Sequence, residues 1–199
     1  MATSNEARFK RQDARRNRER ILAAATQAFA QAGLDTSLEA VARRAGVGIG
    51  TLYRHFPTRE ALAIAAYQHE VQQLCAQATD LLAARAPDQA LREWTGRLVQ
   101  YVATKRGMAP VLKAVLAPGD PYFADVRAQI YKALEALLTR AAHAGSIRPD
   151  VSASDVMQAI SGIWLVTAQP EQHDQAARLL NLMMDGLRYG APGSPEHGR

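Results

Sequence analysis

Cysteine is almost absent from this chain, because Cys75 is the only one among 199 residues. A single thiol cannot form an intramolecular disulfide or a cysteine-based zinc site, and such usage is typical of a reducing compartment. The first residues contain no apolar run of signal-peptide length, and the longest weakly polar stretch, residues 156–168, falls short of the roughly 20 residues that span a bilayer. The sequence therefore predicts a cytoplasmic protein without a membrane anchor.

The patterns of catalytic and metal sites are also missing. The sequence contains no Walker motif, no HExxH, no CxxC pair and no GxSxG. The glycines of residues 46–50 are spaced as in some dinucleotide loops, but the helical pattern before them stands where such a loop requires a strand. We therefore expect no metal site, no cofactor and no catalytic residue, and we predict that the chain is not an enzyme.

The positive charge of the chain is distributed unevenly. There are 24 Lys and Arg residues against 19 Asp and Glu, which gives a formal net charge of +5. Residues 1–60 hold 11 basic and 6 acidic side chains, whereas residues 61–199 hold 13 of each. A local positive field on an otherwise neutral chain is what a phosphate-binding module needs, and a basic disordered tail is the alternative explanation.

Apolar residues recur with helical spacing along almost the whole chain, and no segment shows sustained strand-like alternation. The pattern predicts an all-α protein of about nine helices. The expected helices cover residues 13–32, 36–44, 48–55, 59–84, 88–106, 111–117, 126–144, 152–168 and 171–189. Asp88 is expected to cap one of these helices, and Gly107 to end it.

Residues 36–56 have the pattern of a helix-turn-helix, in which two short helices are joined by a three-residue turn. Thr36 and Glu39 are spaced as a capping box that opens the first helix. Gly46 supplies the left-handed backbone that the turn needs. The contacts between the helices are expected from Leu38, Val41, Ala42, Val47 and Leu52, which leaves Thr51, Tyr53, Arg54 and His55 facing outward.

Three segments in the first third of the chain follow a known family pattern almost without a gap. They are RILAAA at 20–25, continued by Phe29 and Gly33, TSLEAVARRAGVGIGTLYRHF at 36–56, and PTREAL at 57–62. Over residues 16–64 the sequence thus resembles the TetR family of transcriptional regulators. The remainder resembles the family only in helix count and in the loop GSIRPDV at 145–151.

The resemblance implies a three-helix, helix-turn-helix DNA-binding domain followed by a larger helical domain for ligand binding and dimerisation. The expected boundaries are a basic, disordered N-terminal arm at 1–14, the helix-turn-helix domain at 15–57, the helical domain at 58–190 and a disordered tail at 191–199.

The resemblance also implies DNA contacts at the positions that match the family motif. Family residues matching 49–51 lie near base edges or phosphates, and those matching Tyr53 and His55 hold phosphates. Arg59 matches a position that holds the DNA backbone from the fourth helix, and Arg54 matches one where base contacts vary. The complete predicted set is Thr36, Ser37, Arg44, Gly48, Ile49, Gly50, Thr51, Tyr53, Arg54, His55 and Arg59.

Some residues of the second short helix depart from the pattern or have another explanation. The family commonly has a serine and a lysine-like residue where this chain has Gly48 and Ile49. Ile49 would instead offer an apolar contact to a thymine methyl group. Phe56 falls on the inner face and is expected in the core, and without the motif Tyr53 would be read as a core aromatic and His55 as a solvent-facing or satisfied histidine.

The arginines around this motif have two explanations as well. Arg44, at the end of the capped helix, interacts favourably with the helix dipole whether or not DNA is present. Arg15, Arg16 and Arg18 could belong to an arm that reaches a neighbouring minor groove, or they could form a solvated charged face.

The second half of the chain contains aromatic side chains close to bends rich in proline and glycine. Core packing explains each of them singly, but together they suit an apolar pocket with a few orienting NH and OH groups. We therefore predict a small apolar or aromatic effector. The predicted lining is Trp94, Leu98, Tyr101, Met108, Tyr122, Phe123, Tyr131 and Trp164.

The last two expected helices carry more apolar residues than one buried face needs. A second copy of the chain is the simplest cover for the outer side, because an isologous interface joins the same surface of two copies. The predicted interface is Val156, Ile160, Ile163, Leu179, Leu180, Met183, Met184 and Leu187.

The sequence as a whole predicts a TetR-like regulator that binds double-stranded DNA as a homodimer. We expect a repressor that a small ligand releases from a pseudo-palindromic operator. A helical small-molecule-binding protein whose basic head contacts other proteins is the alternative.

Overall fold

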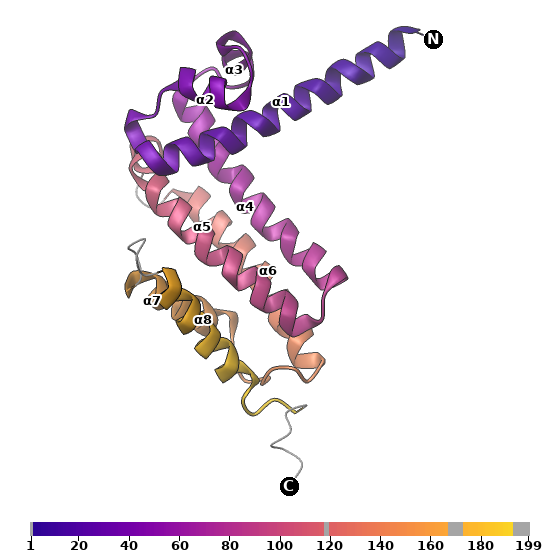
Figure 1. Cartoon of the computed structure of the whole chain (residues 1–199), viewed down its shortest axis with the longest axis vertical. Coiled ribbons are helices and arrows are strands. Elements are labelled where there is room, and N and C mark those ends of the chain that lie inside the picture. Colours follow the sequence, from indigo (N-terminus) through magenta and orange to yellow (C-terminus); the bar gives the residue numbers. More distant parts are fainter. Residues whose placement is uncertain (1, 118–119, 167–172, 193–199) are drawn as a thin grey trace. The chain divides into compact units, whose positions relative to one another are not determined.

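The structure is a computed structural model that describes residues 2–117, 120–166 and 173–192 (Figure 1). Within these ranges it contains eight α-helices, one 3₁₀ turn and no strand, so the all-α prediction is confirmed. The elements are α1 Ala2–Ala32, the 3₁₀ turn η1 Gly33–Asp35, α2 Leu38–Ala45, α3 Ile49–His55, α4 Arg59–Ala84, α5 Pro87–Val115, α6 Pro121–His143, α7 Ala153–Val166 and α8 His173–Arg188. In the described part of the chain, no helix is both long and apolar enough to cross a membrane.

Helix α1 begins well before the residue that the sequence suggested. Its start was expected near Asp13, after a disordered arm, but the helix already runs from Ala2. The first 32 residues contain neither proline nor glycine, so no residue in them interrupts helical hydrogen bonding. The expected tail at 191–199 lies mostly outside the described residues.

Helix α5 is a single helix where the sequence predicted two, and this difference reduces nine helices to eight. Gly107 does not end the helix. A Cβ placed on Gly107 would lie 2.1 Å from the carbonyl oxygen of Ala30, so this glycine lets α5 pack directly against the backbone of α1. The helix begins at Pro87, which places Asp88 inside the first turn and not at the cap.

Pro110 lies inside α5 without ending it. An internal proline costs a helix about 3 kcal/mol, because it removes one hydrogen bond and crowds the preceding turn. Three side chains close to it, Met108, Val111 and Leu112, are buried. Burial of each contributes roughly 1.5–3 kcal/mol, so tertiary packing outweighs the local signal.

The chain forms two compact units. Unit 1 comprises residues 1–70 and 104–119, and unit 2 comprises residues 71–103 and 120–199. Large buried side chains of unit 1 include Ile21, Leu22, Phe29, Leu52, Leu62 and Tyr67. In unit 2 they include Leu91, Trp94, Leu98 and Leu134, and the indole Nε1 of Trp94 donates to the carbonyl oxygen of Leu74 at 2.8 Å.

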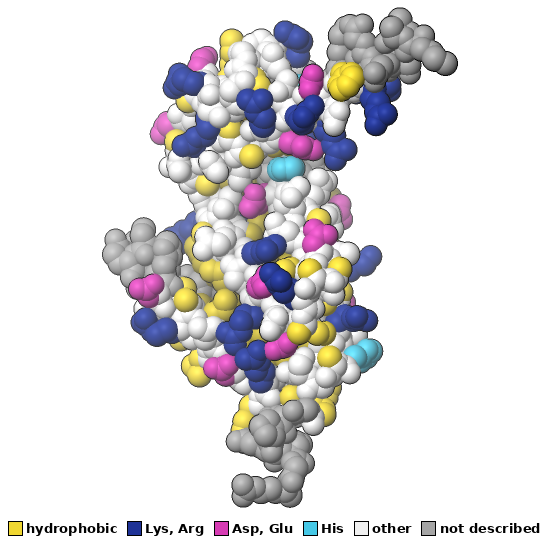
Figure 2. Space-filling view, turned by 45° about the vertical axis from the view of Figure 1, so that its right-hand side comes forward, with side chains coloured by type: hydrophobic (Ala, Val, Ile, Leu, Met, Phe, Trp, Pro, Cys, Tyr) yellow, Lys and Arg dark blue, Asp and Glu magenta, His cyan; other side chains and the backbone are white. Residues whose placement is uncertain are grey.

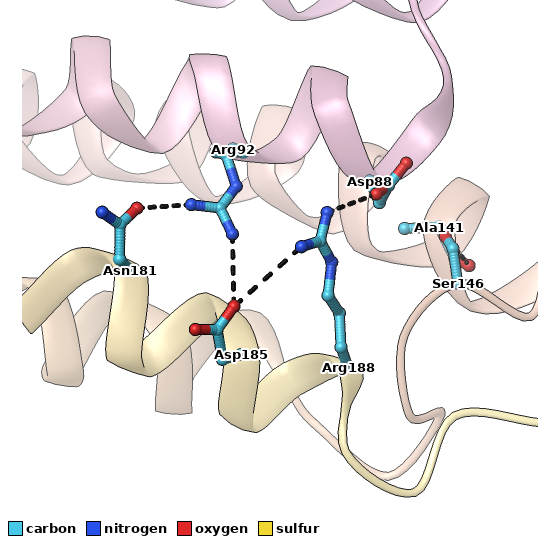
Figure 3. A network of polar contacts seen from close by, with 7 residues as sticks. All are labelled: Asp88, Arg92, Ala141, Ser146, Asn181, Asp185 and Arg188. Carbon is cyan, nitrogen blue, oxygen red and sulfur yellow. Dashed lines mark hydrogen bonds and ion pairs between the residues drawn. The ribbon is translucent and has the colours of Figure 1, made fainter. Parts of the chain in front are cut away.

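Polar side chains join α5 to α8 within unit 2 (Figure 3). Arg92 donates to the side-chain oxygen of Asn181 and also lies 3.4 Å from Asp185. Arg188 donates to Asp88 at 2.6 Å, and the Asp88 side chain is only 21% exposed. Because the two ion pairs, Arg92 with Asp185 and Arg188 with Asp88, lie at different places along the two helices, they fix the position of α8 along α5.

Candidate DNA interface

The N-terminus of α2 is capped by Ser37 and not by Thr36 as the sequence suggested. The Ser37 hydroxyl oxygen accepts from the backbone N–H of Ala40 at 3.2 Å, and the hydroxyl donates to the Glu39 carboxylate at 2.8 Å. Hydrogen bonds from the backbone and from Ser37 lower the pKa of Glu39. The capping signal was correct in kind but displaced by one residue.

Thr36 is buried, with 2% of its surface exposed. Its hydroxyl lies 2.8 Å from the carbonyl oxygen of Gly33 and 3.1 Å from that of Ala28, and it donates toward both. These contacts satisfy the residue inside the protein. The prediction that Thr36 contacts DNA is therefore corrected: this side chain joins the end of α1 to the segment that leads into α2.

The turn between α2 and α3 has the geometry that the sequence predicted. Gly46 has a φ of +63°, and its N–H donates to the carbonyl oxygen of Arg43, while the N–H of Val47 donates to that of Ala42. Arg20 of α1 donates to the carbonyl oxygen of Gly46 at 3.0 Å. A side chain from α1 thus holds the turn that sets the angle between the two short helices.

Helix α3 presents two different faces. Leu52 is fully buried, and Phe56, which follows the helix, is 4% exposed, as the sequence predicted for both. The exposed positions are Gly48, Ile49, Gly50, Tyr53 and Arg54, and Thr51 and His55 are half-buried. Thr51 and His55, which the sequence placed on the outward face with the others, are thus less exposed than expected, and the DNA contacts of this helix stay a prediction.

The glycines at the start of α3 are not explained by packing inside the chain. A Cβ added at Gly48 or Gly50 would meet no atom within 4 Å, and neither residue has a positive φ. Gly50 lies within the helix, where glycine costs about 1 kcal/mol relative to alanine. The surface of α3 is therefore unusually bare at this end, and a partner could approach its backbone closely.

Two further arginines fix the surroundings of α3. The guanidinium of Arg59 donates to the carbonyl oxygen of Leu34 at 2.7 Å, a contact that the sequence did not suggest. It links the start of α4 to η1. The guanidinium of Arg18 lies 5.3 Å from the centre of the Phe56 ring, a cation–π distance.

Ser37 and Arg44 line a hollow of about 570 Å³ between α1 and α2. Both side chains are exposed, so their contact with DNA stays a prediction. The rest of the lining is mostly small or polar, and comprises Ala28, Gln31, Ala32, Asp35, Thr36, Ala40 and Arg43. Sequence reasoning did not find this hollow, because it depends on how α2 crosses α1.

The predicted pocket residues do not all belong to one unit. Met108 lies in unit 1, whereas the other seven lie in unit 2. Trp94, Leu98 and Tyr101 are buried, and the remaining four are half-buried: Tyr122, Phe123, Tyr131 and Trp164. The rings of Tyr122 and Phe123 meet edge to face at 5.9 Å.

Half of the predicted dimer interface is buried within the chain itself. Val156, Ile160, Met184 and Leu187 are at most 6% exposed, so they belong to the core of unit 2, and their assignment to an interface is corrected. The other four predicted residues are half-buried: Ile163, Leu179, Leu180 and Met183. The most exposed apolar side chains of α7 and α8 are Leu165 and Leu182, and Tyr189 follows α8. Helical spacing could have found Leu182 and Tyr189, because residues seven apart share a face of a helix.

Comparisons with known proteins agree with this architecture. Residues 21–66 match the family model described as bacterial regulatory proteins, tetR family, and residues 86–189 match one described as the C-terminal domain of SbtR-like transcriptional regulators. The crystal structure of a TetR transcriptional regulator from Streptomyces coelicolor is 53% identical, with a TM-score of 0.82, and the match covers 86% of this chain and 98% of that one. A TetR transcription regulatory protein from Mycobacterium vanbaalenii is 34% identical over 89% of this chain and 98% of its own, with a TM-score of 0.74. The HTH-type transcriptional repressor KstR of Mycolicibacterium smegmatis is 27% identical over 83% of this chain and 81% of that protein.

Two glycine substitutions test the geometry of the interface. Gly46→Ala should lower the free energy of unfolding by about 1–2 kcal/mol, because an L-residue is strained at a positive φ. Gly50→Ala should raise it by up to about 1 kcal/mol, because the position is helical and open. Urea denaturation followed by circular dichroism measures both changes, and shifts of the same sign would contradict the assigned backbone.

Proposed function

This chain is a transcriptional regulator of the TetR family, and we propose that it represses transcription from a pseudo-palindromic operator until a small apolar or aromatic ligand releases it. The outward surface of α3 is the observation that carries this proposal. There a bare helix start, Ile49, Tyr53 and Arg54 lie together on the exposed side of a helix, and the major groove is wide enough to admit an α-helix. The name of KstR, a transcriptional repressor, supports repression.

The side chains of α3 divide by chemistry into base-reading and phosphate-holding groups. Arg54 can form a bidentate pair with a guanine, and Ile49 can contact a thymine methyl group. Tyr53 and His55 offer phosphate contacts that position the helix without reading sequence. The absence of Cβ atoms at residues 48 and 50 lets the helix start approach the groove closely, which supports a role that outweighs their cost in helix stability.

The residues outside α3 act at its edges. Ser37 and Arg44 lie exposed on α2 and are proposed to contact phosphates. For Arg59, the bond to the carbonyl oxygen of Leu34 supports a role in fixing the turn before α2, in addition to any phosphate contact. Functionally, we assign residues 15–57 to DNA binding and residues 58–190 to ligand binding and dimerisation.

A homodimer formed through α7 and α8 supplies the two-fold symmetry that a pseudo-palindromic operator requires. Leu165 and Leu182 are 73% and 69% exposed in the single chain, which supports a partner surface over these helices. Two α3 helices related by the two-fold axis would read half-sites about 10 bp, or a multiple of this, apart.

The ligand would act through α4, a single helix whose first residues belong to unit 1 and whose later residues belong to unit 2. A ligand held by aromatic side chains of unit 2 would favour one position of α4 over another. It changes DNA affinity only if it binds the two states with different affinity. With this role we also propose a cytoplasmic location and no catalytic activity.

Substitutions in α3 separate base reading from phosphate contact. Arg54→Ala should weaken binding to the operator about 5- to 150-fold, equivalent to roughly 1–3 kcal/mol, and should weaken binding to random DNA much less. Tyr53→Phe should weaken both by a similar factor. Fluorescence anisotropy with a duplex from upstream of the chain's own coding region and with a random duplex, each titrated with salt, measures these changes. Equal losses for Arg54→Ala on both duplexes would contradict the assignment of Arg54 to a base.

A charge on the outer face of α8 tests the dimer. Leu182→Glu should convert the protein to a monomer at micromolar concentration, because the interface would lose an apolar contact and would have to bury a carboxylate. Sedimentation velocity measures the mass. Leu34→Glu is the matched control, because Leu34 is 54% exposed but lies in η1. A dimer that survives Leu182→Glu, or a monomeric unsubstituted protein, would refute the proposed interface.

A further inference from the structure

The excess positive charge of the chain lies in α1 and not in the helix-turn-helix. Residues 1–20 hold seven Lys and Arg against three Asp and Glu, whereas residues 21–60 hold four against three. The segment that contains α3, the helix proposed to read bases, therefore has almost no net charge. Figure 1 shows the N-terminal half of α1 extending past α2 and α3. In Figure 2, Lys and Arg side chains lie over this end and over the lower half of the face in view, with Asp and Glu side chains among them.

Four arginines of this extension follow one face of the helix. Arg8, Arg11, Arg15 and Arg18 are spaced by three, four and three residues, a spacing that brings side chains to the same side of a helix. All four are exposed. We call them the arginine stripe. Glu19 pairs with Arg15 at 3.0 Å. Because the stripe holds four arginines against this one carboxylate, it has a net positive charge over a length of about 15 Å.

The stripe ends beside the C-terminus of α3, at a buried residue of the helix-turn-helix. The guanidinium of Arg18 lies over the ring of Phe56, the residue that directly follows α3. This contact fixes where the stripe meets the helix-turn-helix. A rigid helix, uninterrupted by proline or glycine, then carries the other three arginines away from that point.

The chemistry of the stripe fits a polyanion better than a membrane or a second copy of the chain. Residues 8–18 contain only one large apolar side chain, Phe9, so the segment lacks the apolar face with which a helix enters a lipid surface. A coiled coil needs apolar residues at the three-four spacing that arginines occupy here, and two such stripes would repel each other. A row of phosphates has the complementary charge.

We propose that the arginine stripe binds phosphates of the DNA that flanks the half-site read by α3. It adds affinity that is independent of base sequence, over about four base pairs on each outer side of the operator. The inference rests on the proposed DNA binding. It assigns phosphate contact to the helical extension and base contact to α3, so the two can be removed separately.

A charge-neutral variant of the stripe tests the proposal. Arg8→Gln, Arg11→Gln and Arg15→Gln are combined in the full chain, and Arg18 is kept because it packs on Phe56. Glutamine preserves helix propensity, which circular dichroism verifies. With a long random-sequence duplex, the slope of log K against log salt concentration should fall by roughly 0.9 for each lost phosphate contact, or up to about 3 per protomer.

The matched control removes the same charge from unit 2 by Arg97→Gln, Arg127→Gln and Arg140→Gln, which are exposed positions. This control should keep the slope of the unsubstituted protein. Equal losses in both variants would show an effect of net charge alone, and an unchanged slope in the stripe variant would show a solvated face. Either result overturns the proposal. If the unsubstituted protein binds no DNA, the proposed function fails and this inference fails with it.

Discussion

The contact of α1 with the two ends of α3 is the constraint on which the rest depends. A helix of seven residues with a glycine in its first turn has little stability of its own. It is held because Leu52 is buried, because Arg20 bonds the turn before it, and because Arg18 lies over the ring of Phe56 after it. These contacts stabilise α3 from its inner side. The outward side chains, such as Tyr53 and Arg54, are therefore not needed to hold the helix in place.

The same dependence explains which parts of the fold could be predicted from the sequence. The turn at Gly46 and the outward and inward faces of α3 follow from local spacing, because a positive φ and a helical stripe are properties of neighbouring residues. The end predicted at Gly107 was wrong because the close approach of α1, at Ala30, involves a residue far away in sequence. Capping by Ser37 in place of Thr36 has a more local cause, since the Thr36 hydroxyl donates to the carbonyl oxygens of Gly33 and Ala28 at the end of α1 and does not cap α2.

The parts of the candidate site that depend on neighbouring residues could be predicted from the sequence, and the parts that depend on packing between distant residues could not. Ten of the eleven predicted DNA contacts remain exposed or half-buried, and only Thr36 is buried. The proposed dimer face was harder to predict, because two apolar faces on α7 and α8 look alike in sequence, and only packing decides that Ile160 and Met184 turn inward while Leu165 and Leu182 turn outward. The contacts of Arg92 and Arg188 that hold α8 to α5 likewise join residues that lie far apart in the sequence (Figure 3).

The central claim is that the outward face of α3, supported from α1, is the surface that meets DNA. Hydrogen exchange of the intact protein, with and without a duplex from upstream of its own coding region, tests this claim most directly. The amides of residues 46–56 should gain protection when the duplex binds, because the groove then encloses the start of α3. Binding of the duplex without added protection in residues 46–56 would contradict it.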